Sequence, residues 1–284
     1  MNTLSEEILN SDVNRNDQNA IIPNDNVPNS TNLNSKQDKE NYPVPSDVVA
    51  NSNNLDIESG NDMLVFSQTV RLNFIRKVYG ILSAQLLVTI IICCLNVFTS
   101  VRRFSIENIW LFFTCLVLSL IISITLICFK QYARTSPTNY ILLTIWTLLQ
   151  SYCLMFLSLF NVKIVLLSAS LTIAVTLSLT YYAYTTEEDY TFMGGILFSM
   201  LANFIVVGVF MIAFPQFMKP INVLYSTIGV LLYSTYLIYD TQLIMGKYGV
   251  EYDIDDYIIA AMMVYCDILE IFLHILRILA ELSR

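Results

Sequence analysis

The chain consists of long runs of apolar residues separated by short polar connections. Six runs are almost free of charged residues and have the length, about 20 residues, that a helix needs to cross a bilayer. They lie at about 79–99, 108–129, 140–160, 162–184, 192–214 and 221–245. A seventh run, at about 257–280, is less pure because it carries four ionisable side chains. The pattern predicts an all-α integral membrane protein, a seven-helix bundle with no soluble domain between its spans.

The first 62 residues have a different composition from the rest of the chain. They are rich in Asn, Asp and Ser, and Tyr42 is their one aromatic residue. Such a segment buries too little apolar area to offset the entropy of ordering, so we expect a disordered N-terminal tail over 1–62. The net charge of −8 falls entirely on this tail, because residues 63–284 carry 12 acidic and 12 basic side chains. Without a basic surface, nucleic acid is not an expected partner.

Composition agrees with a membrane protein whose main partner is the lipid bilayer. Of the 284 residues, 55% are hydrophobic and 13% are charged, and the mean hydropathy is +0.59. A basic cluster precedes the first span and favours a cytosolic N-terminus. In the same segment, residues 63–78, Val70, Phe74 and Val78 recur at helical spacing. We therefore expect an amphipathic entry helix that lies at the membrane interface, followed by a transmembrane bundle over 79–284.

Asp240 is the one acidic side chain, Asp or Glu, inside the six clear runs. Inserting an aspartate at the bilayer centre costs about 2.5–3.5 kcal/mol, so a carboxylate there indicates a functional site. Asp267, in the seventh run, is its natural partner. Two adjacent carboxylates share a proton at lower pH, and at higher pH they repel each other and attract cations. Carboxylates also bind Ca²⁺, so the pair is the candidate metal site. The alternative is that each aspartate only hydrogen-bonds a helix end.

Three more polar residues follow Asp267 on the same predicted helix. Glu270, His274 and Arg277 come at steps of three, four and three residues, so all lie along one face. That face must point to the bundle interior or to water. The three residues are possible auxiliaries of the aspartate pair, although Glu270 and Arg277 could simply pair at the interface.

Three segments resemble the transmembrane Bax inhibitor motif family, specifically its lifeguard branch. The segments are "VRLNFIRKVYGILSAQLLVT" (70–89), "YDTQLIMG" (239–246) and "EYDIDDYIIAAMMVYCDILEIFLHILRIL" (251–279). Together with the number of spans and the loop lengths, the likeness covers about residues 65–284. The motif residues that carry it are Arg71, Phe74, Arg76, Lys77, Tyr79, Gln85, Thr241, Gln242 and Tyr265.

The resemblance implies six helices around a central, more polar seventh. It implies a pH-sensitive Ca²⁺ leak in the endoplasmic reticulum or another internal membrane, with a cell-protective, anti-apoptotic role. Ca²⁺ would be the permeant ion and no cofactor is expected. The family's aspartate sensor falls on Asp240 and Asp267. A basic residue near the end of the second helix can latch onto such a pair in the family, and Lys130 and Arg134 lie there.

Two other classes of function were weighed. An intramembrane aspartyl protease also uses two aspartates on adjacent spans, one in a Tyr-Asp motif like Tyr239–Asp240. Its second aspartate would follow Gly-x-Gly, whereas Asp267 follows "VYC", and no Pro-Ala-Leu triplet is present in the last span. A metalloprotease is excluded because His274 is the one histidine and HExxH is missing. We therefore expect no enzyme. A non-conducting scaffold that modulates other, unspecified membrane proteins remains open.

Overall fold

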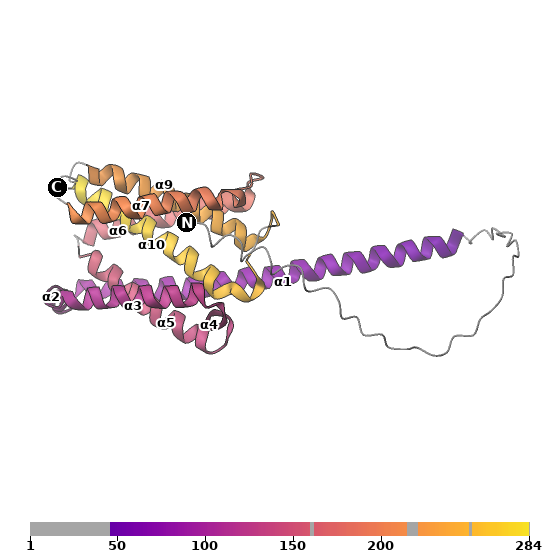
Figure 1. The fold of residues 1–284 in the computed structure, drawn as a ribbon, viewed down its shortest axis with the longest axis horizontal. Helices are drawn as coiled ribbons and strands as arrows, with labels where there is room; N and C mark the ends of the chain where they lie inside the picture. The colour runs from indigo at the N-terminus through magenta and orange to yellow at the C-terminus, as the bar shows by residue number, and fades with distance from the viewer. Residues whose placement is uncertain (1–45, 160–161, 215–220, 250–251, 284) are drawn as a thin grey trace, which may run out of the picture. The chain divides into compact units, whose positions relative to one another are not determined.

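The computed structural model describes residues 46–159, 162–214, 221–249 and 252–283 (Figure 1). Residues from Asn54 to Arg284 form one compact unit, described here by itself. Helices make up nearly all of the described residues, and no strand occurs among them. This confirms the predicted all-α class.

Seven long helices run alternately in opposite directions through this unit (Figure 1). One end carries the short helix α2, Thr99–Glu107, and the end of the last helix; the other carries α4, Lys130–Arg134, and the connection before the last helix. Short 3₁₀ turns precede two of the long helices, η2 at Thr191–Met193 and η4 at Ile254–Asp256. The long helices are α1 (Ser46–Cys94), α3 (Ile109–Cys128), α5 (Thr138–Leu157), α6 (Val162–Thr185), α7 (Gly194–Ala213), α9 (Asn222–Met245) and α10 (Tyr257–Leu282).

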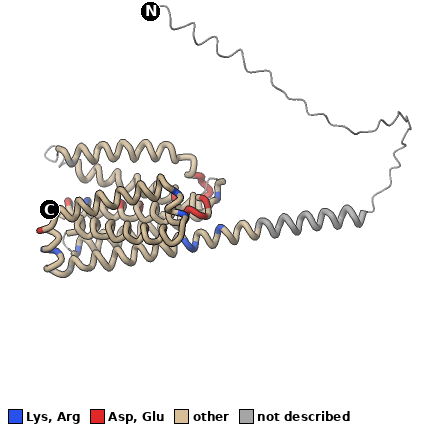
Figure 2. The backbone as a smooth tube through the Cα atoms, turned by 60° about the horizontal axis from the view of Figure 1, so that its bottom comes forward, with Lys and Arg blue, Asp and Glu red and all other residues tan. Residues whose placement is uncertain are grey.

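Six stretches of the described chain are long and apolar enough to cross a membrane. They are Val65–Cys94, Ile109–Cys128, Thr138–Leu157, Val162–Thr185, Thr191–Met211 and Ile254–Leu282. The sequence analysis expected α9 to be one of the clear spans and α10 to be the less pure one. By hydropathy, α10 qualifies as a candidate span and α9 does not. α9 is 24 residues long, but its many Tyr, Ser and Thr residues lower its hydropathy. It crosses the bundle beside the other long helices, and charged residues gather mostly at the two ends of the unit (Figure 2).

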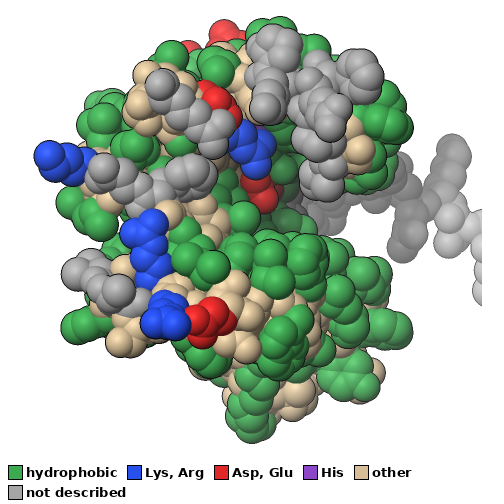
Figure 3. Space-filling model, turned by 90° about the vertical axis from the view of Figure 1, so that its left-hand side faces the viewer, with side chains coloured by type: hydrophobic (Ala, Val, Ile, Leu, Met, Phe, Trp, Pro, Cys, Tyr) green, Lys and Arg blue, Asp and Glu red, His purple; other side chains and the backbone are tan. Residues whose placement is uncertain are grey.

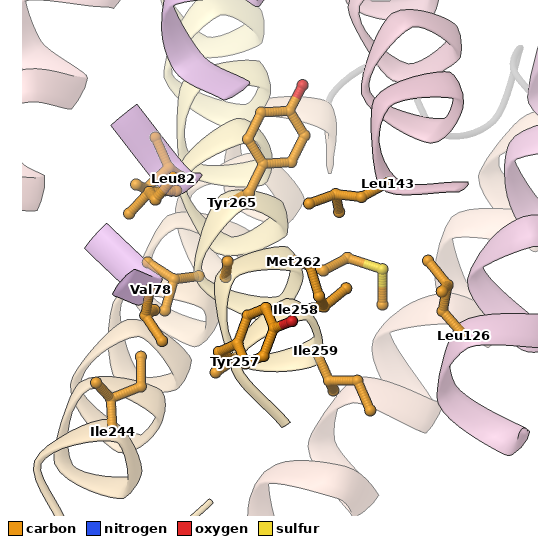
Figure 4. Close-up of a cluster of buried hydrophobic side chains, with 14 of the residues drawn as sticks. Val78, Leu82, Leu126, Leu143, Ile244, Tyr257, Ile258, Ile259, Met262 and Tyr265 are labelled. Carbon is orange, nitrogen blue, oxygen red and sulfur yellow. The ribbon is translucent and has the colours of Figure 1, made fainter. Parts of the chain in front are cut away.

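The last helix, α10, forms the centre of the bundle. In its most apolar 18-residue window 61% of the residues are buried, against 11–39% in the other five candidate spans. Side chains from α1, α3, α5 and α9 point toward it, among them Val78, Leu126, Leu143 and Ile244 (Figure 4). This confirms the expected arrangement of a central seventh helix.

The first helix differs from expectation at its start. α1 begins at Ser46, so the backbone over 46–62 is helical where a disordered tail was expected. A nucleated helix gains one hydrogen bond for each further residue, which allows such an extension. Residues 1–45 of the predicted tail lie outside the described residues. The apolar stripe of the entry segment does not face an interface: Phe74 and Val78 are buried in the main core cluster, which α10 dominates.

Candidate functional site: an aspartate pair between two helices

The structure brings Asp240 and Asp267 together at the contact between α9 and α10. Both side chains are buried, with residue exposures of 6% and 5%. Their carboxyl groups lie within hydrogen-bonding reach of each other. Asp240 sits near the end of α9, which stops at Gly246 because that residue adopts the left-handed conformation, φ 65°. Asp267 lies near the middle of α10.

The surroundings of the pair are polar but carry no positive charge. No Lys or Arg forms an ion pair with either aspartate in the part of the chain that the structure describes. Asp267 Oδ2 is buried and accepts no hydrogen bond from a described donor, so a proton shared with Asp240 would satisfy it. Neutral hydroxyl and thiol side chains line the environment, namely Tyr233, Tyr236, Tyr239, Tyr252 and Cys266. The carboxyl group of Glu270, one turn further along α10, also acts electrostatically on Asp267.

Tyr252 closes over the pair from the connection between α9 and α10. Its hydroxyl donates to Asp240 Oδ1 at 3.2 Å. Arg71 of α1 holds this connection, because its Nη1 donates to the Tyr252 carbonyl at 2.8 Å and its Nη2 donates to the Leu243 carbonyl. Burial, and after it the Asp240 carboxylate, raise the pKa of Tyr252 well above its usual value, so the hydroxyl remains a donor. The sequence analysis missed Tyr252, which lies outside every apolar run.

The two candidate latch residues are engaged elsewhere. Arg134 donates two hydrogen bonds to the Asp256 carboxylate, from Nε at 2.7 Å and from Nη2 at 3.0 Å. Its Nη2 also donates to Asp253 Oδ2 at 2.9 Å. Lys130 Nζ lies 3.4 Å from Asp256 Oδ2. The hydrogen bond to Asp256 raises the pKa of Arg134. Among the described residues neither base contacts the aspartate pair, so the structure offers no contact for the predicted latch.

The three residues that follow Asp267 on the predicted polar face of α10 differ in burial. His274 is 3% exposed, and the rings of Phe204, Tyr225 and Tyr233 surround it at centroid distances of 5.4–5.8 Å. Glu270 is only partly buried, with Oε2 3.9 Å from His274 Nε2. Arg277 is exposed near the helix end. His274 follows Asp267 by seven residues, about 10 Å along the helix, so aromatic packing accounts for its burial.

Most of the family motif residues join helices to one another. Gln85 Nε2 donates to Thr147 at 3.0 Å, and the Tyr265 hydroxyl shares a hydrogen bond of 2.8 Å with Thr89. Gln242 accepts from the Tyr190 N–H at 2.8 Å and donates to the Glu188 carbonyl at 2.9 Å. These bonds fix α1 to α5 and α10, and α9 to the segment after α6. The remaining motif positions are buried Phe74 and Thr241, half-buried Tyr79, Lys77 with Nζ 3.2 Å from the Tyr257 ring centroid, and exposed Arg76.

The site around the aspartate pair offers few ligands for a resident metal ion. The described residues contain no group of three or more His, Cys, Asp or Glu side chains placed to hold one. Ca²⁺ takes six to eight oxygen ligands, of which the two aspartates supply only part. The two aspartates alone do not complete a Ca²⁺ coordination sphere, and Ca²⁺ binding by Asp240 and Asp267 stays a prediction.

Fold and site together define a multi-pass α-helical membrane protein with a carboxylate pair buried in its bundle. Residues 71–284 match the family described as "Inhibitor of apoptosis-promoting Bax1", and the chain belongs to this Bax inhibitor family. It is 29% identical to human Protein lifeguard 3 over 216 residues, 75% of this chain and 70% of the relative. It is 31% identical to mouse Protein lifeguard 4 over 233 residues, 81% of this chain and 93% of the relative. The predicted family is confirmed.

Proposed function

We propose that the protein is a pH-sensitive Ca²⁺ leak of an internal membrane, such as the endoplasmic reticulum, gated by Asp240 and Asp267. The observation that carries this proposal is the burial of two adjoining carboxyl groups with no described basic partner. The family description, inhibition of apoptosis-promoting Bax1, supports a cell-protective role for the leak. We place the N-terminus in the cytosol, as the basic cluster before the first span favours.

In the closed state the pair shares one or two protons and holds α9 against α10. A protonated carboxyl donates to its neighbour, so Asp267 Oδ2 is satisfied without a cation. The Tyr252 hydroxyl and the Arg71 guanidinium fasten the connection over this end of the pair. An ion would then meet a neutral, hydrogen-bonded barrier between the two helices.

The open state follows from loss of the shared proton. Two unit charges about 4 Å apart repel by about 4 kcal/mol at an effective dielectric constant of about 20. That energy is enough to separate α9 from α10 locally and to release Tyr252. The same two charges stabilise a partly dehydrated divalent cation between the helices. Flux of Ca²⁺ therefore rises with pH.

The test is Ca²⁺ flux into proteoliposomes that contain the purified protein, compared at two pH values. Asp240→Asn should remove the pH dependence, because the neutral amide cannot ionise. Glu270→Gln is the matched control: it also removes one carboxyl from the same region, about one helical turn beyond Asp267, and should leave most of the pH dependence in place. If the wild-type protein carries no flux at either pH, the leak is rejected and the non-conducting scaffold becomes the better account.

A further inference from the structure

A cavity of about 390 Å³ opens between α1, α5, α6 and α10, and neither aspartate is among its lining residues. Its walls are mostly aliphatic. Three wall residues, Ile90, Leu166 and Ile173, are also among the exposed hydrophobic residues of the surface, so the cavity opens sideways toward lipid. Figure 3 looks onto the end that carries α2 and shows a furrow between two largely hydrophobic masses, with both basic and acidic side chains near its rim.

Arg102 of α2 lines this cavity and is the one charged residue among its described lining residues. Its Nη2 donates to the Leu159 carbonyl at 2.9 Å. No carboxylate pairs with Arg102 in the chain as described, in contrast with Arg103, which bonds Glu107 at 2.7 Å. The cavity thus joins an apolar interior to a guanidinium with donors to spare, since arginine carries five N–H groups.

Two buried polar atoms in the cavity wall have no described hydrogen-bond partner. Asn96 Oδ1 and Thr176 Oγ1 are shielded from solvent and have no hydrogen-bond partner among the described residues. A buried polar group without a partner is costly, and such groups mark places where a ligand or water completes the site. Asn96 Oδ1 needs a donor and Thr176 Oγ1 can donate or accept, so hydroxyl and ester groups of a lipid headgroup would satisfy them, whereas an acyl chain would not.

We propose that this cavity binds one anionic phospholipid, with an acyl chain inside and the headgroup phosphate at Arg102. The volume lies within the range of about 300–1,000 Å³ typical of small-molecule sites, and the apolar walls suit an acyl chain. Arginine binds phosphate through paired, charge-assisted hydrogen bonds. A second protein would have to insert a side chain between the helices, because the cavity is a recess that opens sideways and not a flat face. A lipid with no net charge would leave the cation at the mouth less well neutralised.

The site has a direct bearing on the central helix. Ile268 and Leu269 line the cavity from α10, immediately after Asp267 in the sequence. A bound acyl chain would therefore pack against the helix that carries half of the aspartate pair. The lipid site itself does not depend on the proposed leak, and its test needs no flux measurement.

The test is native mass spectrometry of the full-length protein in detergent, titrated separately with dioleoyl phosphatidylglycerol and dioleoyl phosphatidylcholine. One arginine near the membrane surface favours an anionic lipid by about fivefold. We expect wild type to bind phosphatidylglycerol about fivefold more tightly than phosphatidylcholine. Arg102→Gln should abolish this preference. Arg103→Gln, which removes a neighbouring arginine already paired with Glu107, should retain it.

A second variant tests the acyl-chain part of the site. Ala169 lines the cavity from α6, and Ala169→Phe places a ring where the chain would lie. This variant should weaken binding of both lipids at least several-fold while circular dichroism stays that of wild type. Equal preference for phosphatidylglycerol in wild type and Arg102→Gln would overturn the proposal, and so would undiminished binding by a folded Ala169→Phe protein. Should that variant fail to fold, the comparison of the two arginine variants decides alone.

Discussion

Replacing Tyr252 by Phe removes one hydroxyl and keeps the ring. The lost hydroxyl is the donor to Asp240 Oδ1 at 3.2 Å. The side chain of Arg71 holds the connection by a hydrogen bond to the Tyr252 main-chain carbonyl. Because Arg71 binds the Tyr252 carbonyl rather than its side chain, the variant should keep the path of the connection. The substitution therefore isolates the contact between the connection and the aspartate pair.

The size of the effect follows from the burial of the acceptor. Asp240 is 6% exposed, so its oxygen has little access to water when the donor is removed. Leaving a buried acceptor unsatisfied costs about 1–3 kcal/mol. If the open state lacks this bond, the whole cost falls on the closed state. A shift of that size changes a two-state equilibrium by about 5- to 150-fold, so the leak should rise within that range while the closed state still dominates.

The assay is Ca²⁺ flux into proteoliposomes at one fixed pH near neutrality. Tyr248→Phe is the control. Tyr248 lies in the same connection as Tyr252, and its hydroxyl donates at the same distance, 3.2 Å, but to the Thr186 carbonyl after α6. It should leak like wild type. On an Asp240→Ala background, Tyr252→Phe should add little, because the acceptor of the Tyr252 hydroxyl has been removed. A Tyr252→Phe protein that leaks no faster than Tyr248→Phe would refute the proposed closure over the pair.

Three further outcomes are expected in thermal melts of the detergent-solubilised protein. Gly229→Ala should destabilise the folded protein by about 1–3 kcal/mol, because the new Cβ would lie 2.5 Å from the His274 imidazole. Gly195→Ala is the control, since its Cβ would have no heavy atom within 4 Å. Equal melting temperatures of the two variants would contradict the close contact between α9 and α10. Arg134→Gln should lower the melting temperature more than Lys130→Gln, since Arg134 makes two bonds to buried Asp256 and Lys130 one longer one; the reverse order would count against this ranking. The wild-type melting temperature should rise as pH falls from about 8 to about 5, because protonation ends the repulsion within the pair; a fall would argue against a shared proton.

The aspartate pair could be predicted from the sequence because charge is rare in apolar runs. Asp240 is conspicuous within its run, and Asp267 lies on the one other helix that carries acids at membrane depth. The central place of α10 was likewise implied by the family resemblance. The prediction of the pair depends on residues within regular helices, where periodicity constrains the direction of each side chain.

Contacts made by the connections could not be predicted in the same way. Tyr252 reaches Asp240 only because the chain turns back after Gly246 and Arg71 fixes its carbonyl. Arg134 was placed correctly near the helix end, but whether it meets Asp256 or the aspartate pair depends on how α4 and η4 pack. No periodic pattern encodes such tertiary choices. The amphipathic stripe with Phe74 failed for a related reason: periodicity gives the apolar face but not what covers it.

The central claim is that the two aspartates gate the leak as one unit. The most direct measurement is the ratio of Ca²⁺ flux at a higher and a lower pH in proteoliposomes of four proteins: wild type, Asp240→Asn, Asp267→Asn and the double variant. The account predicts a ratio well above one for wild type and close to one for each single variant. The double variant should match the singles, because either substitution already removes the ionising pair. Four equal ratios, or single effects that add in the double variant, would contradict the claim.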